Sequence, residues 1–216
     1  MSFVGGVGYS NIDLIYSGLD RLPDKGEEIF ARGFSMQFGG GIPATMINLS
    51  RLGVESRIIT FAGHDLFSEF VKKTLNSYPV KTVNLYKGNK MPVVLSSTLL
   101  YCGDRSFISY TDGMDLNDAV MDEVYENLKG AYVVDMHVGF LDVYKRLKKD
   151  GCIQIFDTGW EDDLTLEKYK DYLEIADYYI PNQKEAMKIT GTSSVEEAAD
   201  ILSEFFSDVT IKMDKE

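Results

Sequence analysis

Short apolar runs alternate with segments of helical periodicity along most of the chain. The runs have the length and composition of buried strands. They cover residues 3–9, 57–63, 131–137, 152–157, 177–180 and 209–213. Between them the pattern predicts helices over 43–52, 65–78, 117–128, 140–149, 166–175 and 195–206, with a shorter helix that starts near Asn182 and ends near Gly191. Such alternation favours an α/β fold, a mostly parallel sheet flanked by helices.

Two stretches interrupt this alternation. Residues 14–38 are polar and rich in turn formers, and residues 92–111 contain two β-rich runs joined by Cys102-Gly103-Asp104-Arg105, which is a hairpin signal. An antiparallel flap in a parallel α/β domain often serves as a lid or a dimer surface. An edge hairpin without a function is the alternative. We expect one α/β domain over 1–216, with 14–38 and 92–111 as an inserted β lid.

The composition narrows the function classes. The chain has 216 residues, of which 34 are acidic and 22 basic, so the net charge is −12. A surface of this sign repels phosphate backbones, so we expect neither nucleic acid nor an anionic membrane as a partner. No apolar run predicts a membrane span, and the N-terminus lacks a signal-peptide pattern. Cys102 and Cys152 stand alone without a C-x-x-C spacing. We therefore expect a cytoplasmic protein with reduced cysteines.

The most distinctive segment is Gly39-Gly40-Gly41-Ile42-Pro43-Ala44-Thr45, in which three glycines lead into a predicted helix. Glycine lets a ligand approach the backbone closely, and a helix N-terminus offers free N–H groups with a partial positive charge. Hydroxyl-rich or anionic ligands suit such a place. A flexible turn before a helix is the alternative.

Asn11 and Asp13 follow the first predicted strand and stand two positions apart, so an extended backbone turns both side chains the same way. A carboxylate and an amide on one side can bind neighbouring sugar hydroxyls. A solvated strand end is the alternative. The nearby Gly6-Val7-Gly8 lacks the third small residue of a dinucleotide fingerprint, and no helical pattern follows it.

Three further polar residues stand where parallel strands end. Asn182 and Glu185 have the spacing of a capping box, which would give them a structural role. The carboxyl edge of a parallel sheet is also where ligands bind, and Glu185 could hold a hydrated Mg²⁺ there. His137 ends another strand and could touch a substrate, although a core or surface histidine is commoner. The chain contains neither a P-loop nor a G-x-S-x-G elbow.

In this order along the chain, these motifs resemble the ribokinase-like (PfkB) carbohydrate kinases. The resemblance covers the whole chain and includes Gly63-His64-Asp65 and Thr190-Gly191. It implies a sugar kinase that transfers the γ-phosphoryl group of ATP to a sugar hydroxyl, with ATP and Mg²⁺ as cofactors. By position, the sugar would be bound by Asn11, Asp13, Gly40, Gly41, Thr45 and His137. The nucleotide side would involve Asn182, Glu185 and Lys212, with Glu185 acting on Mg²⁺ through water. The lid would close over the sugar and exclude water, and it could also join two subunits in a homodimer.

Three departures from the family pattern stand out. Thr45 replaces the usual asparagine of the glycine-rich signature, and Ser68 replaces a glycine that usually follows the G-x-D segment. The G-A-G-D motif, which carries the family's catalytic base and anion hole, does not occur in the 216 residues. We therefore expect the base to lie outside this sequence, in C-terminal elements that the chain lacks.

Two other functions stay open at this point. One is a non-catalytic sugar-binding or regulatory fragment. The other is a nucleoside kinase on the same scaffold, because Tyr101, Phe107 and Tyr110 in the flap could stack a base, although aromatic residues in a β flap more often serve packing.

Overall fold

The computed structural model describes residues 2–213, and the chain divides into two compact units. The first unit combines the N-terminal strand, up to Val7, with the chain from Leu116 onward, and the second unit spans Gly8–Asp115. The expected single domain with its inserted lid stays a prediction. Each unit is described by itself.

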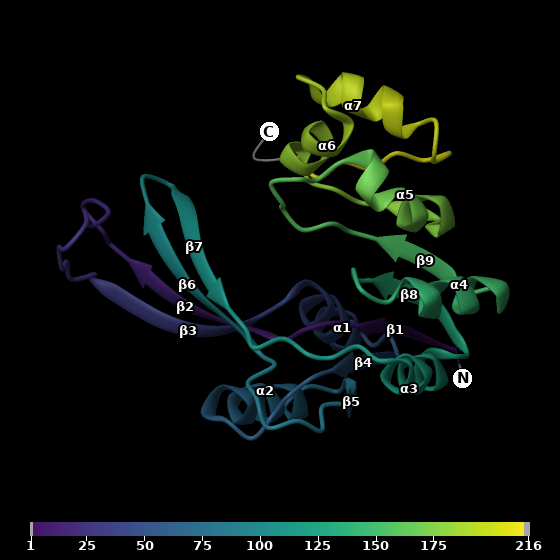
Figure 1. Ribbon diagram of the computed structural model, residues 1–216, viewed down its shortest axis with the longest axis horizontal. Helices are drawn as coiled ribbons and strands as arrows, with labels where there is room; N and C mark the ends of the chain where they lie inside the picture. The colour runs from purple at the N-terminus through teal and green to yellow at the C-terminus, as the bar shows by residue number, and fades with distance from the viewer. Residues whose placement is uncertain (1, 214–216) are drawn as a thin grey trace. The chain divides into compact units, whose positions relative to one another are not determined.

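The first unit is built on parallel strands that pair in the order β10-β9-β8-β1. Its strands are β1 (Phe3–Val7), β8 (Ala131–Met136), β9 (Ile153–Phe156) and β10 (Tyr178–Tyr179). Its helices are α3 (Asp118–Leu128), α4 (Leu141–Lys149), α5 (Leu166–Ile175), α6 (Gln183–Thr190) and α7 (Val195–Leu202). In Figure 1, α4 and α5 run alongside β8 and β9. Their contact buries Val134, Phe156 and Leu147 completely, which forms the core of this unit.

The second unit contains one parallel pair and a separate four-stranded sheet. Strands β4 (Ser56–Thr60) and β5 (Lys81–Asn84) are parallel, and helices α1 (Gly41–Arg51) and α2 (Leu66–Asn76) belong with them. The other sheet has the order β3-β2-β6-β7 and is called the lid sheet. Its strands are β2 (Asn11–Ser17), β3 (Gly33–Gly39), β6 (Val94–Tyr101) and β7 (Asp104–Tyr110). The six parallel strands of the described chain, flanked by helices, confirm the predicted α/β fold class.

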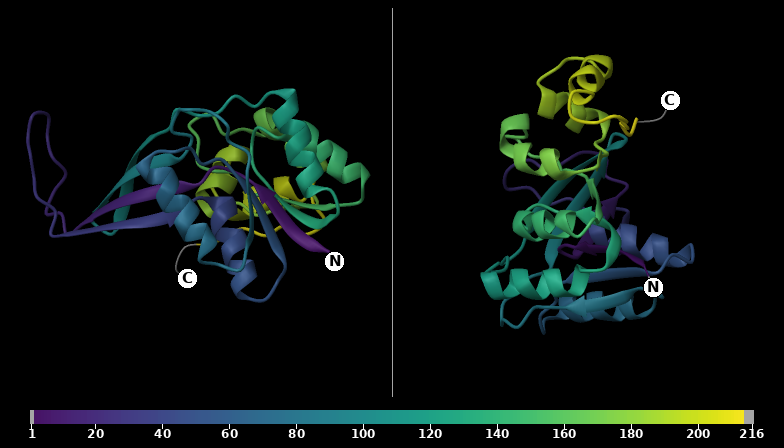
Figure 2. Two further views of the ribbon diagram at one scale, coloured as in Figure 1. Left: turned by 90° about the horizontal axis from the view of Figure 1, so that it is seen from below. Right: turned by 90° about the vertical axis from the view of Figure 1, so that its right-hand side faces the viewer.

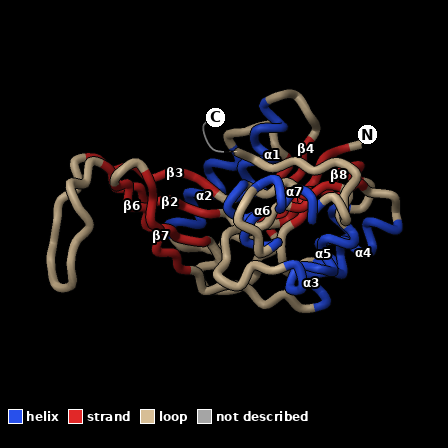
Figure 3. The backbone as a smooth tube through the Cα atoms, turned by 90° about the horizontal axis from the view of Figure 1, so that it is seen from above, coloured by secondary structure: helices blue, strands red, loops and turns tan. Residues whose placement is uncertain are grey.

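The lid sheet starts earlier than the sequence pattern indicated. Strand β2 pairs antiparallel with β3 from Asn11 opposite Gly39 to Ser17 opposite Gly33, so Asn11 and Asp13 are part of the lid sheet itself. The irregular segment 18–32 joins these two strands and extends beyond their ends, as the purple loop in Figure 2 and the tan loop in Figure 3 show. The predicted hairpin over 93–111 is confirmed by the antiparallel pairing of β6 with β7.

Three predictions about the strands and helices were wrong: one predicted strand is absent, one strand was missed, and the last helix is shorter than predicted. Residues 209–213 do not form a buried strand: only Lys212 makes a β-bridge, with Asn182, and a single bridge cannot build a ladder. Strand β5 was missed because its sequence, Lys-Thr-Val-Asn, is short and exposed at both ends. The last helix ends at Leu202 rather than at residue 206. No helix in residues 2–213 is both long and apolar enough to cross a membrane.

Candidate functional site

The carboxylate of Asp13 lies against the glycine segment that precedes α1. A Cβ atom placed on Gly39 would be 2.6 Å from Asp13 Oδ2 and 3.6 Å from the Cβ of Asn11. Real Cβ atoms do not approach an oxygen so closely, so a side chain at Gly39 would displace this carboxylate. The predicted neighbourhood of the acid and the glycine segment is therefore present within the second unit.

Asp13 has no hydrogen-bond donor among the described residues. Burial raises the pKa of its carboxyl group, and the positive charge of Arg105 opposes this rise without cancelling it. A half-buried carboxylate has lost part of its water, and the protein does not replace that water with donors here. The free acceptor capacity of Asp13 suits a ligand that brings hydroxyl groups.

The N-terminus of α1 begins next to this carboxylate without a side-chain cap. Its N-cap residue is Gly40, which has a φ of 103° and no side chain to offer. A Cβ on Gly40 would be 2.8 Å from the carbonyl oxygen of Tyr9. Pro43 has no N–H, and Ala44 donates its N–H to the carbonyl of Gly40 at 3.0 Å. The N–H groups of Gly41 and Ile42 are left without a side-chain acceptor in the described chain.

Most other helices of the described chain do not share this feature. Side-chain oxygens accept from the N-terminal N–H groups of α2, α3, α5, α6 and α7; they belong to Asp65, Asn117, Thr165, Asn182 and Ser194. Just before α4, the N–H of Gly139 donates to the hydroxyl of Tyr172 at 2.8 Å. Helix α4 likewise lacks a side-chain cap on its N-cap residue, so α1 is one of two helices within residues 2–213 that begin without one.

The space above this open end is free. A Cβ on Gly41 would meet no atom within 4 Å, so a ligand can reach the backbone there. Thr45, one turn along, is exposed, and its hydroxyl donates to the carbonyl of Gly41 at 3.1 Å. The hydroxyl proton of Thr45 is therefore used within the helix, and only its acceptor lone pairs remain for a ligand.

The lid sheet has two chemically different faces. Residues paired across neighbouring strands share a face, so Asp13 lies with Gln37, Ser96 and Ser109. The opposite face is mostly apolar; besides Ser97 and Ser106 it contains Ile12, Leu14, Tyr16, Phe34, Met36, Phe38, Leu95, Leu99, Ile108 and Tyr110. The strand register thus turns a polar face with one acid to one side and an apolar face to the other.

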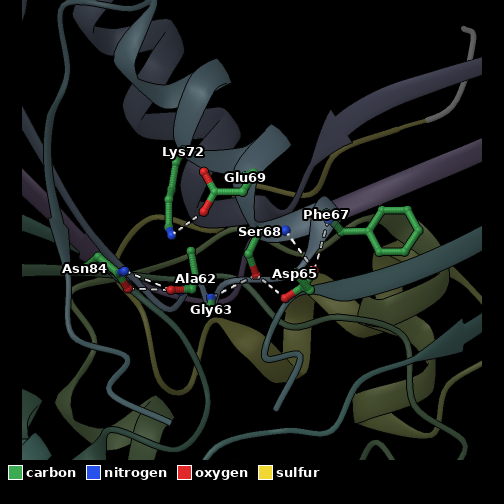
Figure 4. A network of polar contacts seen from close by, with 8 residues as sticks. All are labelled: Ala62, Gly63, Asp65, Phe67, Ser68, Glu69, Lys72 and Asn84. Carbon is green, nitrogen blue, oxygen red and sulfur yellow. Dashed lines mark hydrogen bonds and ion pairs between the residues drawn. The ribbon is translucent and has the colours of Figure 1, made fainter. Parts of the chain in front are cut away.

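The G-x-D segment is held together by Ser68, the residue that replaces a glycine of the family pattern (Figure 4). The Ser68 hydroxyl donates to Asp65 Oδ2 at 2.6 Å and accepts from the N–H of Gly63 at 2.8 Å. Asp65 caps α2 through the N–H groups of Phe67 and Ser68. Burial acts to raise the pKa of Asp65, but these hydrogen bonds outweigh it and lower the pKa. Asp65 and Ser68 therefore stabilise the start of α2.

In the first unit, Asn182 and Glu185 form the predicted capping box. Asn182 Oδ1 accepts from the N–H of Glu185 at 2.9 Å, and Glu185 Oε2 accepts from the N–H of Asn182 at 2.9 Å. Glu185 is only 6% exposed, and burial raises the pKa of its carboxyl group despite these hydrogen bonds. The structural role of the pair is thus present.

Lys212 connects this box to Asp157 at the end of β9. Its backbone N–H donates to the carbonyl of Pro181 at 2.8 Å, and its carbonyl accepts from the N–H of Gln183 at 2.9 Å. Its ammonium group contacts Asp157 Oδ2 at 2.6 Å. Burial raises the pKa of Asp157, and Lys212 opposes the rise. The sequence indicated that Asp157 ends a strand, but its pairing with Lys212 depends on the chain's return beside Pro181.

His137 is held near the end of β8. Its ring Nδ1 lies 2.8 Å from the carbonyl oxygen of Val138, and its backbone N–H donates to the hydroxyl of Tyr144. Burial lowers the pKa of its imidazole, so the neutral form is favoured near pH 7. The structure gives His137 a place in the first unit, and its contact with a substrate stays a prediction.

A comparison with protein families identifies the family whose members carry this glycine segment and these strand-end acids. The family of pfkB carbohydrate kinases matches residues 1–216. The chain belongs to this family. The pfkB match includes both the Asp13 site of the second unit and the Asn182–Glu185 box of the first. It confirms the resemblance stated from the motifs.

Known proteins resemble this chain in sequence or in fold. A candidate sugar kinase of Pyrococcus horikoshii is 35% identical over 92 residues, which are 40% of this chain and 30% of that protein. The fold is similar to that of Arabidopsis thaliana ribokinase, solved with ribose and ATP, with a TM-score of 0.76 and 21% identity over 99% of this chain and 72% of the ribokinase. The ribokinase of Giardia lamblia gives a TM-score of 0.79 and 18% identity, over 98% of this chain and 68% of its own.

Proposed function

We propose that this chain provides the sugar-binding part of an ATP-dependent sugar kinase. One observation carries the proposal: Asp13, a half-buried carboxylate without a donor, lies against Gly39 beside the uncapped start of α1. Both the acid and the helix N-terminus have hydrogen-bonding capacity that the described residues leave unused. A polyol offers donors to the first and acceptors to the second.

The sugar would be held by groups of opposite character. One sugar hydroxyl donates to Asp13, and the Asn11 amide, on the same strand face, can donate to or accept from a neighbouring hydroxyl. The N–H groups of Gly41 and Ile42 donate to a hydroxyl oxygen above the open helix start. The polar face of the lid sheet would cover the sugar and exclude water, which is a competing acceptor in phosphoryl transfer.

The nucleotide side would use the polar cluster of the first unit. The described residues contain no group of three or more metal-ligating side chains, so a fully protein-bound metal does not fit there. A Mg²⁺ ion that keeps most of its waters fits better, with Glu185 as an outer partner and Lys212 near the phosphates. Bound Mg²⁺ would neutralise charge on the phosphates of ATP. Asn182, Glu185 and Lys212 would orient this network.

The 216 residues contain no G-A-G-D segment. We therefore propose that this sequence binds the sugar and that the proton acceptor for the attacking hydroxyl lies outside it. The purified chain should bind its substrate without phosphorylating it. Turnover by these residues alone would show that one of their own carboxylates serves as the base.

A nucleoside acceptor is the second candidate, and one observation favours it. Phe107 pairs with Thr98 on the same face as Asp13, and the guanidinium of Arg105 lies 5.6 Å from its ring centroid. One aromatic ring on the polar face could stack a base. Tyr110 lies on the apolar face, so it cannot join Phe107 in a clamp.

We also propose that the apolar face of the lid sheet pairs with a second copy of this chain. Phe34 is 61% exposed and Ile108 is 72% exposed on this face. A two-fold dimer would bury the same apolar patch of both copies at once. Sedimentation of the chain and of its Ile108→Lys variant tests this: a dimer that the variant dissociates supports it, and a monomer in both contradicts it.

Calorimetric titration with a panel of pentoses, hexoses and nucleosides tests the main proposal. Asp13→Asn removes the candidate carboxylate, and Asp20→Asn is the matched control, because Asp20 is exposed in the lid and pairs with Arg32. We expect a sugar to bind the chain and the Asp20 variant but not the Asp13 variant. Nucleoside binding that Phe107→Ala abolishes would select the second candidate. Equal affinity of the Asp13 and Asp20 variants would contradict both.

A further inference from the structure

An open cavity of about 650 Å³ lies in the first unit, between α6 and the chain that joins β9 to α5. Trp160 and Asp162 line it from that connection, and Lys184, Met187 and Lys188 line it from α6. None of these residues was assigned a role by the motifs or by the proposed kinase site. Its volume is in the range of pockets that hold small organic ligands.

Two lysines of the cavity have no carboxylate partner among the described residues. Lys184 and Lys188 stand four positions apart on α6 and both line the cavity. Like charges at this spacing destabilise a helix, so stability of α6 does not explain the pair. Nearby lysines are paired instead: Lys145 with Asp171, Lys148 with Asp177, and Lys168 with Glu161.

The absence of partners is informative because acids are abundant. The chain carries 34 acidic residues against 22 basic ones. Even so, the ammonium group of Lys188 makes no ion pair with a described carboxylate and lies 5.8 Å from the ring centroid of Trp160. Two ammonium groups that line one cavity, neither of them in an ion pair with a described carboxylate, form a site for an external anion.

The other walls indicate what the anion would carry. Trp160 is 58% exposed, so its ring can stack on a planar base or on the C–H face of a sugar. Asp162 would repel a second anion but accepts hydrogen bonds from hydroxyl groups. We propose that this cavity binds a phosphate ester of a hydroxylated ring, with the phosphate at the two lysines, the ring on Trp160 and hydroxyls at Asp162. This site is independent of the sugar-binding site proposed above.

The chain offers a direct readout, because Trp160 is its single tryptophan. Its fluorescence, excited at the red edge of indole absorption, is followed while the whole chain is titrated with glucose 6-phosphate, AMP, glucose or inorganic phosphate. We expect a saturable change with one of the two phosphate esters, and the responding ester identifies the ring as a sugar or a nucleoside. Glucose and inorganic phosphate should bind far more weakly, since each lacks half of the recognised groups.

Lys188→Gln should weaken the ester at least about tenfold, because it removes a charge-assisted contact to the phosphate. Lys149→Gln is the matched control, since Lys149 is a helical lysine of the same unit outside the cavity. Higher salt should weaken binding in parallel. The proposal is overturned if neither ester changes the fluorescence at millimolar concentration, if inorganic phosphate binds as tightly as the esters, or if both lysine variants behave alike. Circular dichroism of each variant shows whether the fold is retained.

Discussion

The two polar sites of this chain differ in how far the protein satisfies them. In the second unit, Asp13 has no donor and α1 begins without a cap. In the first unit, Asn182 and Glu185 accept each other's N–H groups in a complete capping box. Unsatisfied polar groups cost stability, whereas a capping box contributes to it.

This difference separates two kinds of motif that look alike in a sequence. A polar pair whose groups hydrogen-bond within the protein contributes to stability. That contribution alone accounts for the pair, so a functional role needs additional evidence. A polar pair that the fold leaves open is explained best by a ligand that completes it. The Asp13 site is of the second kind, and this is why it carries the proposed function.

The largest expected effect distinguishes two neighbouring glycines of the open site. Gly40→Ala should lower the free energy of unfolding by about 2 kcal/mol or more, because its φ is 103° and its Cβ would be 2.8 Å from a carbonyl oxygen. Gly41→Ala is the matched control and should be neutral or stabilising by about 0.5 kcal/mol, since its Cβ meets open space at a helix start. Urea denaturation measures both. An equal loss in the two variants would contradict the described geometry.

The next effect is on sugar affinity without an effect on stability. If the sugar approaches the backbone above Gly41, the added methyl group of Gly41→Ala should weaken sugar binding about tenfold or more, which corresponds to about 1.4 kcal/mol. Calorimetry on the same stable variant measures this. Unchanged affinity would mean that the glycine serves the turn and not the ligand.

A substitution in the Asn182–Glu185 capping box should lower the stability of the fold, unlike Gly41→Ala. Glu185→Ala should lower the free energy of unfolding by about 1 kcal/mol, because it removes half of the capping box. Glu185→Gln keeps a side chain that can cap and should retain most of this stability. Thermal melting of both variants tests the expectation. If Glu185→Ala melts like the parent chain, the box contributes nothing and the contrast between the sites fails.

The smallest effect is a pH dependence that should have opposite signs for the stability of the fold and for the sugar affinity. Burial raises the pKa of Asp13, so the folded state takes up its proton at a higher pH than the unfolded chain does. As the pH falls through this window, the folded state gains a little stability, while sugar affinity falls because the carboxylate is lost. Titrations at several pH values should show this divergence, and Asp13→Asn should remove it. A parallel decline of affinity and stability would indicate general acid unfolding instead.

Much of this contrast depends on tertiary contacts that the sequence does not contain. The two-residue spacing of Asn11 and Asp13 correctly predicted a shared face, and the spacing of Asn182 and Glu185 predicted the capping box. The space available for a Cβ atom differs between Gly39, Gly40 and Gly41. It is set by β2 and Tyr9, which are distant in the chain.

Similar limits apply in the first unit and the lid sheet. The pairing of Asp157 with Lys212 requires the chain to return beside Pro181, and no local pattern encodes that. The apolar run 209–213 predicted a strand, but a strand needs a neighbour along its length. The polar and apolar faces of the lid sheet follow from strand register, which the alternation in β2 alone does not fix.

The most direct test of the open site measures Asp13→Asn twice, once for stability and once for sugar affinity. Because Asp13 has no hydrogen-bond donor in the described chain, the variant should melt at the same temperature as the parent or slightly higher. Its affinity for the sugar should fall about 10- to 100-fold, as expected for a lost hydrogen bond to a charged group. A variant that melts at a lower temperature and still binds the sugar normally would show that Asp13 supports the fold and not a ligand.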